Sequence, residues 1–119
     1  MNPYFPHLFS PMKVKNVTYR NRIFFAPTAL KEMSDHNYID YHTFDYLERR
    51  AIGGAASIPL GEGVVHETGT VEWSKKLHLW EDRSEPGIYT LATKIRAHGA
   101  VPTLELNHAG MHFHDDNRI

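Results

Sequence analysis

Cysteine is absent from this chain of 119 residues, and neither sign of charge is in excess. Without a thiol, neither a disulfide framework nor a thiolate metal site can form. The 13 Lys and Arg residues nearly balance the 14 Asp and Glu residues, and they form no basic block or acidic tail. A balanced surface of this kind attracts neither nucleic acid nor an anionic membrane, so we expect neither as a partner.

Long apolar runs are absent as well. No stretch approaches the roughly 20 apolar residues of a membrane-spanning helix. Met1–Ser10 lacks the charged start and apolar run of a secretory signal. We therefore expect a soluble protein, and the lack of cysteine fits a cytoplasmic location. A Gly-x-Gly-x-x-Gly turn is also missing, which weakens a dinucleotide-binding interpretation.

The patterns that are present predict alternating strands and helices. The expected elements are a small hairpin over 13–20, a strand over Ile23–Ala26 buried on both faces, a helix over Tyr41–Ile52, a strand over Ala55–Leu60, a helix from Ser84 to Gly99 and a strand over Val101–Leu106. Asp40 and Ser84 are suitable N-caps for the two helices. Pro59 fits the middle of a strand only at a bulge. Residues 28–39 and 63–83 are expected to form loops.

Strand, helix, strand, helix, strand in this order predicts an α/β fold with parallel pairing. A flavodoxin-like open sheet begins in the same way as a parallel barrel. The periodicity therefore leaves these two architectures open.

Several short motifs favour the barrel over the open sheet, because they resemble those of a known family. They are Leu8-Phe9-Ser10-Pro11, Asn21-Arg22, Gly53-Gly54-Ala55-Ala56-Ser57, Gly61-Glu62, His98-Gly99 and Glu105-Leu106-Asn107-His108-Ala109-Gly110. In this order and spacing they resemble the Old Yellow Enzyme family of FMN-dependent oxidoreductases. The resemblance is nearest to the branch of 2,4-dienoyl-CoA reductase and the bile-acid-inducible reductases. It implies that residues 1–119 form the N-terminal third of a (β/α)8 TIM barrel, a fold of about 250 residues.

The family binds FMN across the carboxyl ends of the barrel strands, where the connecting loops converge. By resemblance, Pro27, Thr28 and Ala29 would contact the flavin from the first strand. Gly61 and Glu62 would do so from the second. Glu105 stands where most members place a glutamine that hydrogen-bonds the flavin pyrimidine ring.

The resemblance also implies a reaction. In the intact family, NAD(P)H passes a hydride to the flavin, which reduces an activated C=C bond. The residues that grip the substrate and donate the proton lie beyond residue 119 in the family pattern. We therefore assign no catalytic residue to this chain and expect no activity from it alone.

Two other functions remain open at this point. His108, His112 and His114 have a spacing that could ligate a metal, and Asp115 and Asp116 could complete the site. Alternatively, the open edges of a three-strand sheet could pair with a second copy or with a polypeptide that completes the barrel.

Overall fold

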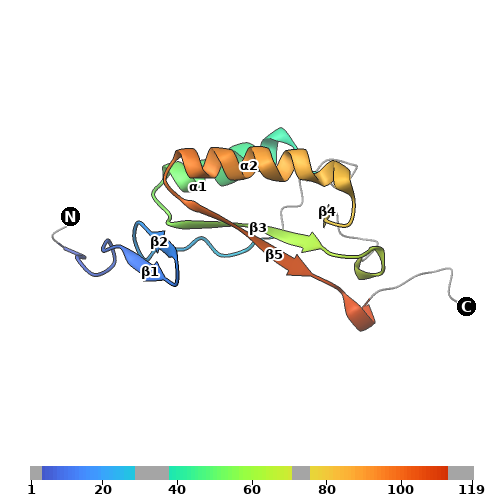
Figure 1. The fold of residues 1–119 in the computed structure, drawn as a ribbon, viewed down its shortest axis with the longest axis horizontal. Helices are drawn as coiled ribbons and strands as arrows, with labels where there is room; N and C mark the ends of the chain where they lie inside the picture. The colour runs from blue at the N-terminus through green and yellow to red at the C-terminus, as the bar shows by residue number, and fades with distance from the viewer. Residues whose placement is uncertain (1–3, 29–37, 71–75, 113–119) are drawn as a thin grey trace, which may run out of the picture.

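The computed structural model describes residues 4–28, 38–70 and 76–112 (Figure 1). Near its N-terminus, β1 (Met12–Val14) pairs antiparallel with β2 (Val17–Tyr19). Lys15 adopts a positive φ of 51° in the turn that joins them. The small hairpin predicted over 13–20 is confirmed.

The centre of the fold is a three-stranded parallel sheet. Its strands are β3 (Ser57–Val64), β4 (Leu77–His78) and β5 (Val101–Asn107), in the order β4-β3-β5. β3 pairs with β5 from Ser57–Val101 onward. The predicted parallel arrangement is therefore confirmed, and the order fits the start of a barrel.

Helix α1 (Tyr41–Ile52) has the bounds that the sequence predicts. The Asp40 side chain caps it by accepting a hydrogen bond of 2.9 Å from the backbone N–H of Thr43. This bond satisfies one of the N–H groups that a helix start leaves without an intrahelical partner. Gly53 follows the last turn and donates its N–H to the carbonyl of Arg49.

Helix α2 (Glu85–Ala97) also follows the prediction, with one difference at its start. Ser84 stands at the N-cap position, but its side chain makes no capping bond. The Ser84 hydroxyl instead donates to the carbonyl of His78, which ties the helix to β4. Gly99 ends the helix with a φ of +74°, a conformation that glycine adopts without a Cβ clash.

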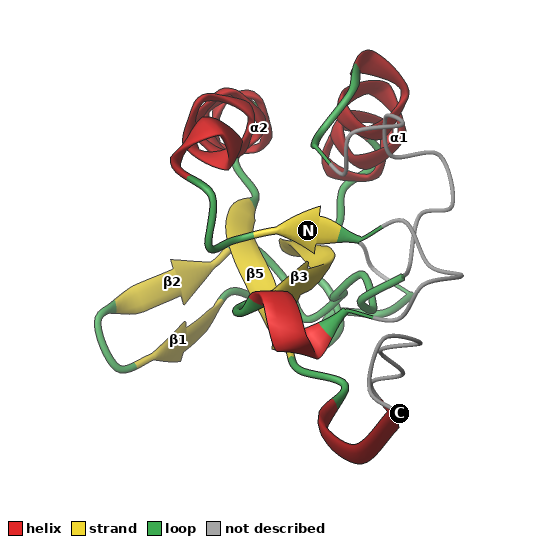
Figure 2. Ribbon diagram, turned by 90° about the vertical axis from the view of Figure 1, so that its right-hand side faces the viewer, coloured by secondary structure: helices red, strands yellow, loops and turns green. Residues whose placement is uncertain are grey.

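Both helices lie on the same face of the sheet (Figures 1 and 2). The core between them consists of buried apolar residues: Leu47, Ala51, Ile58, Leu60, Leu77, Leu91, Ile95 and Ala100. Burying one such Leu or Ile side chain contributes about 1.5–3 kcal/mol. None of the helices in the described ranges is long and apolar enough to cross a membrane.

A partly buried ion pair joins the two helices. Lys94 Nζ donates to Glu48 Oε2 at 2.6 Å, and His98 Nε2 lies 3.0 Å from Glu48 Oε1. The hydrogen bonds from Lys94 and then His98 hold the pKa of the Glu48 carboxyl below its usual value.

The hairpin is fastened to the helix ends by Arg20. Its guanidinium donates to the carbonyl oxygens of His98 at 2.5 Å, Ala51 at 2.6 Å and Ala55 at 2.8 Å. The buried Asn21 adds a bond of 2.8 Å to the carbonyl of Gly54. These two residues hold the segment before the first strand against both helix-to-strand turns.

Two of the expected segments differ in detail from the prediction. Ile23–Ala26 is not buried on both faces, because Phe24 is 48% exposed and only β3 pairs with this segment in the described part of the chain. Its pairing is a parallel bridge between Phe24 and Ser57. The expected loop over 63–83 contains the end of β3, all of β4 and two 3-10 turns, Glu67–Gly69 and Asp82–Ser84.

Candidate functional site

The C-terminal halves of β3 and β5 converge around Gly61 with the end of the segment Ile23–Ala26, which bridges to β3 at Phe24. A Cβ atom built on this buried glycine would lie 2.4 Å from Glu105 Oε2 and 3.4 Å from the Cβ of Pro27. With any other residue here the Glu105 carboxylate would have to move, so glycine is what allows the approach as it stands. Pro27, Thr28, Gly61, Glu62 and Glu105 together form what we call the strand-end surface.

A β-bulge lies at the centre of this surface. Leu60 pairs with Leu104 and Gly63 pairs with Leu106, so Gly61 and Glu62 together oppose the single residue Glu105. Bulges of this kind bend a strand and redirect its side chains. The sequence suggested a bulge at Pro59, but Pro59 pairs regularly with Thr103 and the irregularity comes two residues later.

The Glu62 side chain, turned by the bulge, is held from both sides. Glu62 Oε2 accepts a hydrogen bond of 2.6 Å from Asn107 Nδ2 at the end of β5. The same oxygen forms an ion pair with Lys76, the residue before β4. The side chains of Lys76 and Glu62 are only 14% and 29% exposed. A carboxylate this sheltered from water requires such partners.

Thr28 and Ala29 are the remaining residues expected at this surface. Thr28 is exposed, and its hydroxyl donates to the carbonyl of Ala26 at 3.2 Å. Ala29 lies outside the described residues. The structure therefore brings together Pro27, Gly61, Glu62 and Glu105 from three strand ends.

His108 belongs to a separate polar group after β5. Its Nδ1 accepts the backbone N–H of Gly110 at 3.0 Å, and its Nε2 lies 3.2 Å from the Thr68 hydroxyl. Thr68 also lies 3.0 Å from Nδ1 of His66. Of the other residues in the expected metal cluster, His112 ends the turn Gly110–His112, and His114, Asp115 and Asp116 lie outside the described residues.

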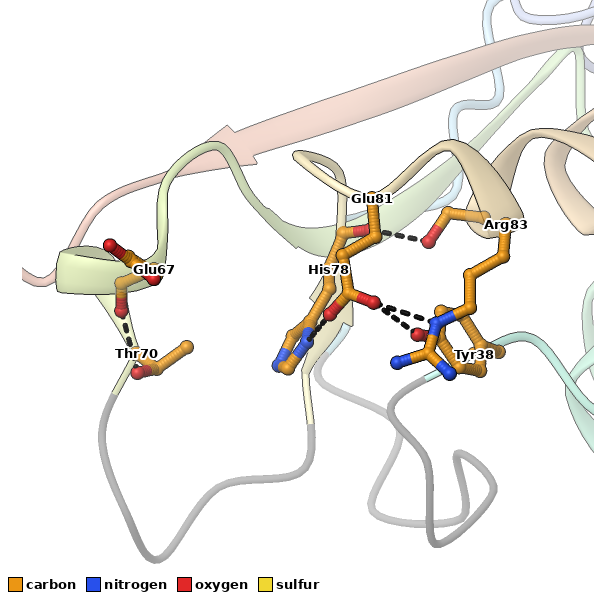
Figure 3. Close-up of polar contacts among 7 residues, drawn as sticks. Tyr38, Glu67, Thr70, His78, Glu81 and Arg83 are labelled. Carbon is orange, nitrogen blue, oxygen red and sulfur yellow. Dashed lines mark hydrogen bonds and ion pairs between the residues drawn. The ribbon is translucent and has the colours of Figure 1, made fainter.

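A third polar group centres on the Glu81 carboxylate (Figure 3). It accepts hydrogen bonds from Tyr38 at 2.5 Å and Arg83 at 2.7 Å, and it pairs with His78 at 2.8 Å. The His78 ring in turn stacks on Trp80. This group fastens the segment before α1 to the turn between β4 and α2.

Sequence reasoning missed Lys76 and the role of the Asn107 side chain. Lys76 is one of two adjacent lysines in a polar stretch, and no pattern distinguishes it there. Its role depends on β4 pairing with Gly63 and Val64, which brings the lysine beside the bulge. Lys76 is identified only by the pairing of β4 with β3, and the amino-acid composition of this stretch does not encode that pairing.

Comparison with known proteins covers nearly the whole chain. A sequence model described as the NADH:flavin oxidoreductase / NADH oxidase family matches residues 7–119. An NADPH dehydrogenase of Listeria welshimeri is 34% identical over 105 residues, which are 87% of this chain and 30% of that protein. The chain therefore spans less than a third of this relative.

Two solved structures extend the likeness to three dimensions. A 2-naphthoyl-CoA reductase in complex with 2-naphthoyl-CoA superposes with a TM-score of 0.85 at 27% identity, over 92% of this chain and 17% of that one. The old yellow enzyme from Trypanosoma cruzi gives a TM-score of 0.77 at 26% identity, over 89% of this chain and 28% of that one.

Proposed function

Because the chain belongs to the NADH:flavin oxidoreductase / NADH oxidase family, we propose that it supplies part of the FMN site of an NAD(P)H-dependent oxidoreductase. The observation that carries this proposal is the convergence of Pro27, Gly61 and Glu105 at three parallel strand ends. Carboxyl ends of barrel strands are where enzymes of this fold place their ligands. Bound FMN would supply hydride-transfer chemistry.

The residues of the strand-end surface suit a flat ring. Gly61 is buried and carries no side chain, so a ring can approach its backbone closely. Pro27 presents an apolar surface, and Thr28 is exposed beside it. Glu105 is half-buried and can accept a hydrogen bond from a ring N–H. Their role is to bind and orient the cofactor.

The test is a fluorescence titration of the purified chain with FMN. We expect saturable quenching, and we expect Glu105→Gln to bind FMN more tightly because a neutral amide can both donate and accept. Glu85→Gln, an exposed residue of α2, removes the same charge away from the surface and serves as the control. Absence of quenching in the unmodified chain would contradict the proposal.

The substrate class is a finer part of this proposal. We infer reduction of the C=C bond of an α,β-unsaturated carbonyl or thioester by an assembled enzyme that contains this segment. Support for a thioester comes from the likeness to 2-naphthoyl-CoA reductase and from the motifs of the 2,4-dienoyl-CoA reductase branch. The direct measurement is NAD(P)H oxidation by the assembled enzyme with an enoyl thioester.

A second candidate function is association through β5. Among the described strands, none pairs with the outer edge of β5. Leu104 and Leu106 on this strand are 38% and 65% exposed. An unpaired strand edge with apolar side chains favours the addition of another strand. A second copy would double the mass measured by light scattering, whereas a completing polypeptide would leave the chain monomeric until that polypeptide is added.

A further inference from the structure

The Glu62 carboxylate in the bulge pairs with a charge that comes from outside β3 and β5. We propose that Lys76 is a positioning residue: it holds the Glu62 carboxylate, and through it the bulge that presents Gly61 to the cofactor. This inference rests on the proposed function for its cofactor, but the contact itself is independent of it. Lys76 touches neither Gly61 nor Glu105 in the contacts described above.

Lys76 is well placed for this role because the backbone that follows it is paired in the sheet. The next two residues form β4, whose Leu77 and His78 pair with Gly63 and Val64. These are the first regular pairs after the bulge. The ammonium group therefore extends from a chain segment that is hydrogen-bonded directly beside Glu62.

Glu62 is thereby tied to both neighbouring strands. Lys76 holds it from the β4 side, and Asn107 holds it from the β5 side. Without the lysine, a sheltered carboxylate would keep only a neutral partner, and turning outward to water would become favourable. That movement would disturb the peptide between Gly61 and Glu62, which belongs to the strand-end surface.

Charge gives Lys76 a second effect. Glu62 and Glu105 are two carboxylates in one bulge, and Lys76 compensates one of them. An uncompensated Glu62 would repel a ligand that carries a phosphate. Removing the lysine should therefore weaken FMN binding, and removing both charges together should restore it.

Amide hydrogen exchange tests the positional role without any cofactor. The reporters are Val65, whose N–H bonds to the Asn107 carbonyl, and Leu79, whose N–H bonds to the Val64 carbonyl. The internal reference is Val101, whose N–H bonds to the Ala56 carbonyl at the other end of the same strands. In Lys76→Met we expect about five- to tenfold faster exchange at the two reporters and less than about twofold at the reference.

Lys94→Met is the matched control, because it removes the lysine of the Glu48 ion pair between the helices. This substitution should leave the rates of amide exchange at Val65 and Leu79 unchanged. Equal exchange in Lys76→Met and the unmodified chain would overturn the proposal. Acceleration at all three amides alike would also overturn it, since general destabilisation would then explain the result.

FMN titration separates the positional role from the proposed function. We expect Lys76→Met to bind FMN about fivefold more weakly and Lys76→Met/Glu62→Gln to recover most of that loss. A loose bulge with unchanged FMN affinity would show that Lys76 does not position the cofactor surface. If the unmodified chain binds no FMN, the proposed function fails, and hydrogen exchange alone decides whether Lys76 holds the bulge.

Discussion

Replacing the half-buried Arg20 by methionine should destabilise the fold far more than the same exchange at an exposed arginine. The guanidinium joins three carbonyl oxygens from both helix-to-strand turns, those of Ala51, Ala55 and His98. Methionine keeps an apolar stem of similar length but donates no hydrogen bond. The three carbonyl oxygens would then lose their charged partner, and Ala51 is fully buried.

The size of the effect follows from these contacts. A hydrogen bond from a charged donor contributes about 1.5–3 kcal/mol, so three bonds set an upper range of roughly 4.5–9 kcal/mol. Desolvation of the guanidinium offsets part of this. Its Nε is buried without an acceptor among the described residues. We therefore expect a loss of ~3 kcal/mol in the free energy of unfolding.

Urea unfolding followed by circular dichroism measures this loss. With a slope of about 1.5 kcal/mol per molar urea, ~3 kcal/mol lowers the midpoint by about 2 M. Arg20→Lys should retain part of the stability, because an ammonium supplies the charge without the planar fork. Arg49→Met removes an exposed arginine of α1 and is the control. A midpoint shift in Arg20→Met no larger than in this control would refute the reasoning.

Two further predictions concern the helices. Leu91→Ala should lower the free energy of unfolding by about 3 kcal/mol, because Leu91 is only 2% exposed and its loss leaves a cavity. The control is Tyr89→Ala, at a position 72% exposed. In the same urea experiment it should lower the free energy of unfolding by about 0.5 kcal/mol or less. Glu48 contributes stability above the pKa of the unfolded carboxyl, about 4.3, and this contribution is lost as the pH falls through the lower folded pKa. The urea midpoint of Glu48→Gln should therefore decline less than that of the unmodified chain below about pH 5, and parallel declines would contradict this assignment.

Local signals in the sequence predicted the helices well. Asp40 and the glycines after Ile52 delimit α1, because capping depends on residues within one turn of the helix end. Apolar spacing identified the inward positions of α2, where Leu91 and Ile95 are buried. Each of these features is decided by neighbours a few residues away.

Long-range features were beyond the reach of the same reasoning. The bonds of Arg20 reach carbonyl oxygens 31, 35 and 78 residues away, and a backbone acceptor leaves no trace in residue type. The 48% exposure of the Phe24 side chain depends on which other strands pack beside it, and the local sequence does not specify this. At the strand ends, the family motif predicts flavin contacts at Gly61 and Glu62, but it does not point to Lys76, whose position depends on the pairing of β4.

The bulge between β3 and β5 is not required by the sheet itself. Deleting Glu62 would leave Gly61 opposite Glu105, while the pairs Leu60–Leu104 and Gly63–Leu106 would both stay in place. A strand one residue shorter would thus run straight and keep its register at both ends. The additional residue makes the strand pairing less regular. It also places a carboxylate at the carboxyl end of the sheet, where residues of two neighbouring segments bind it.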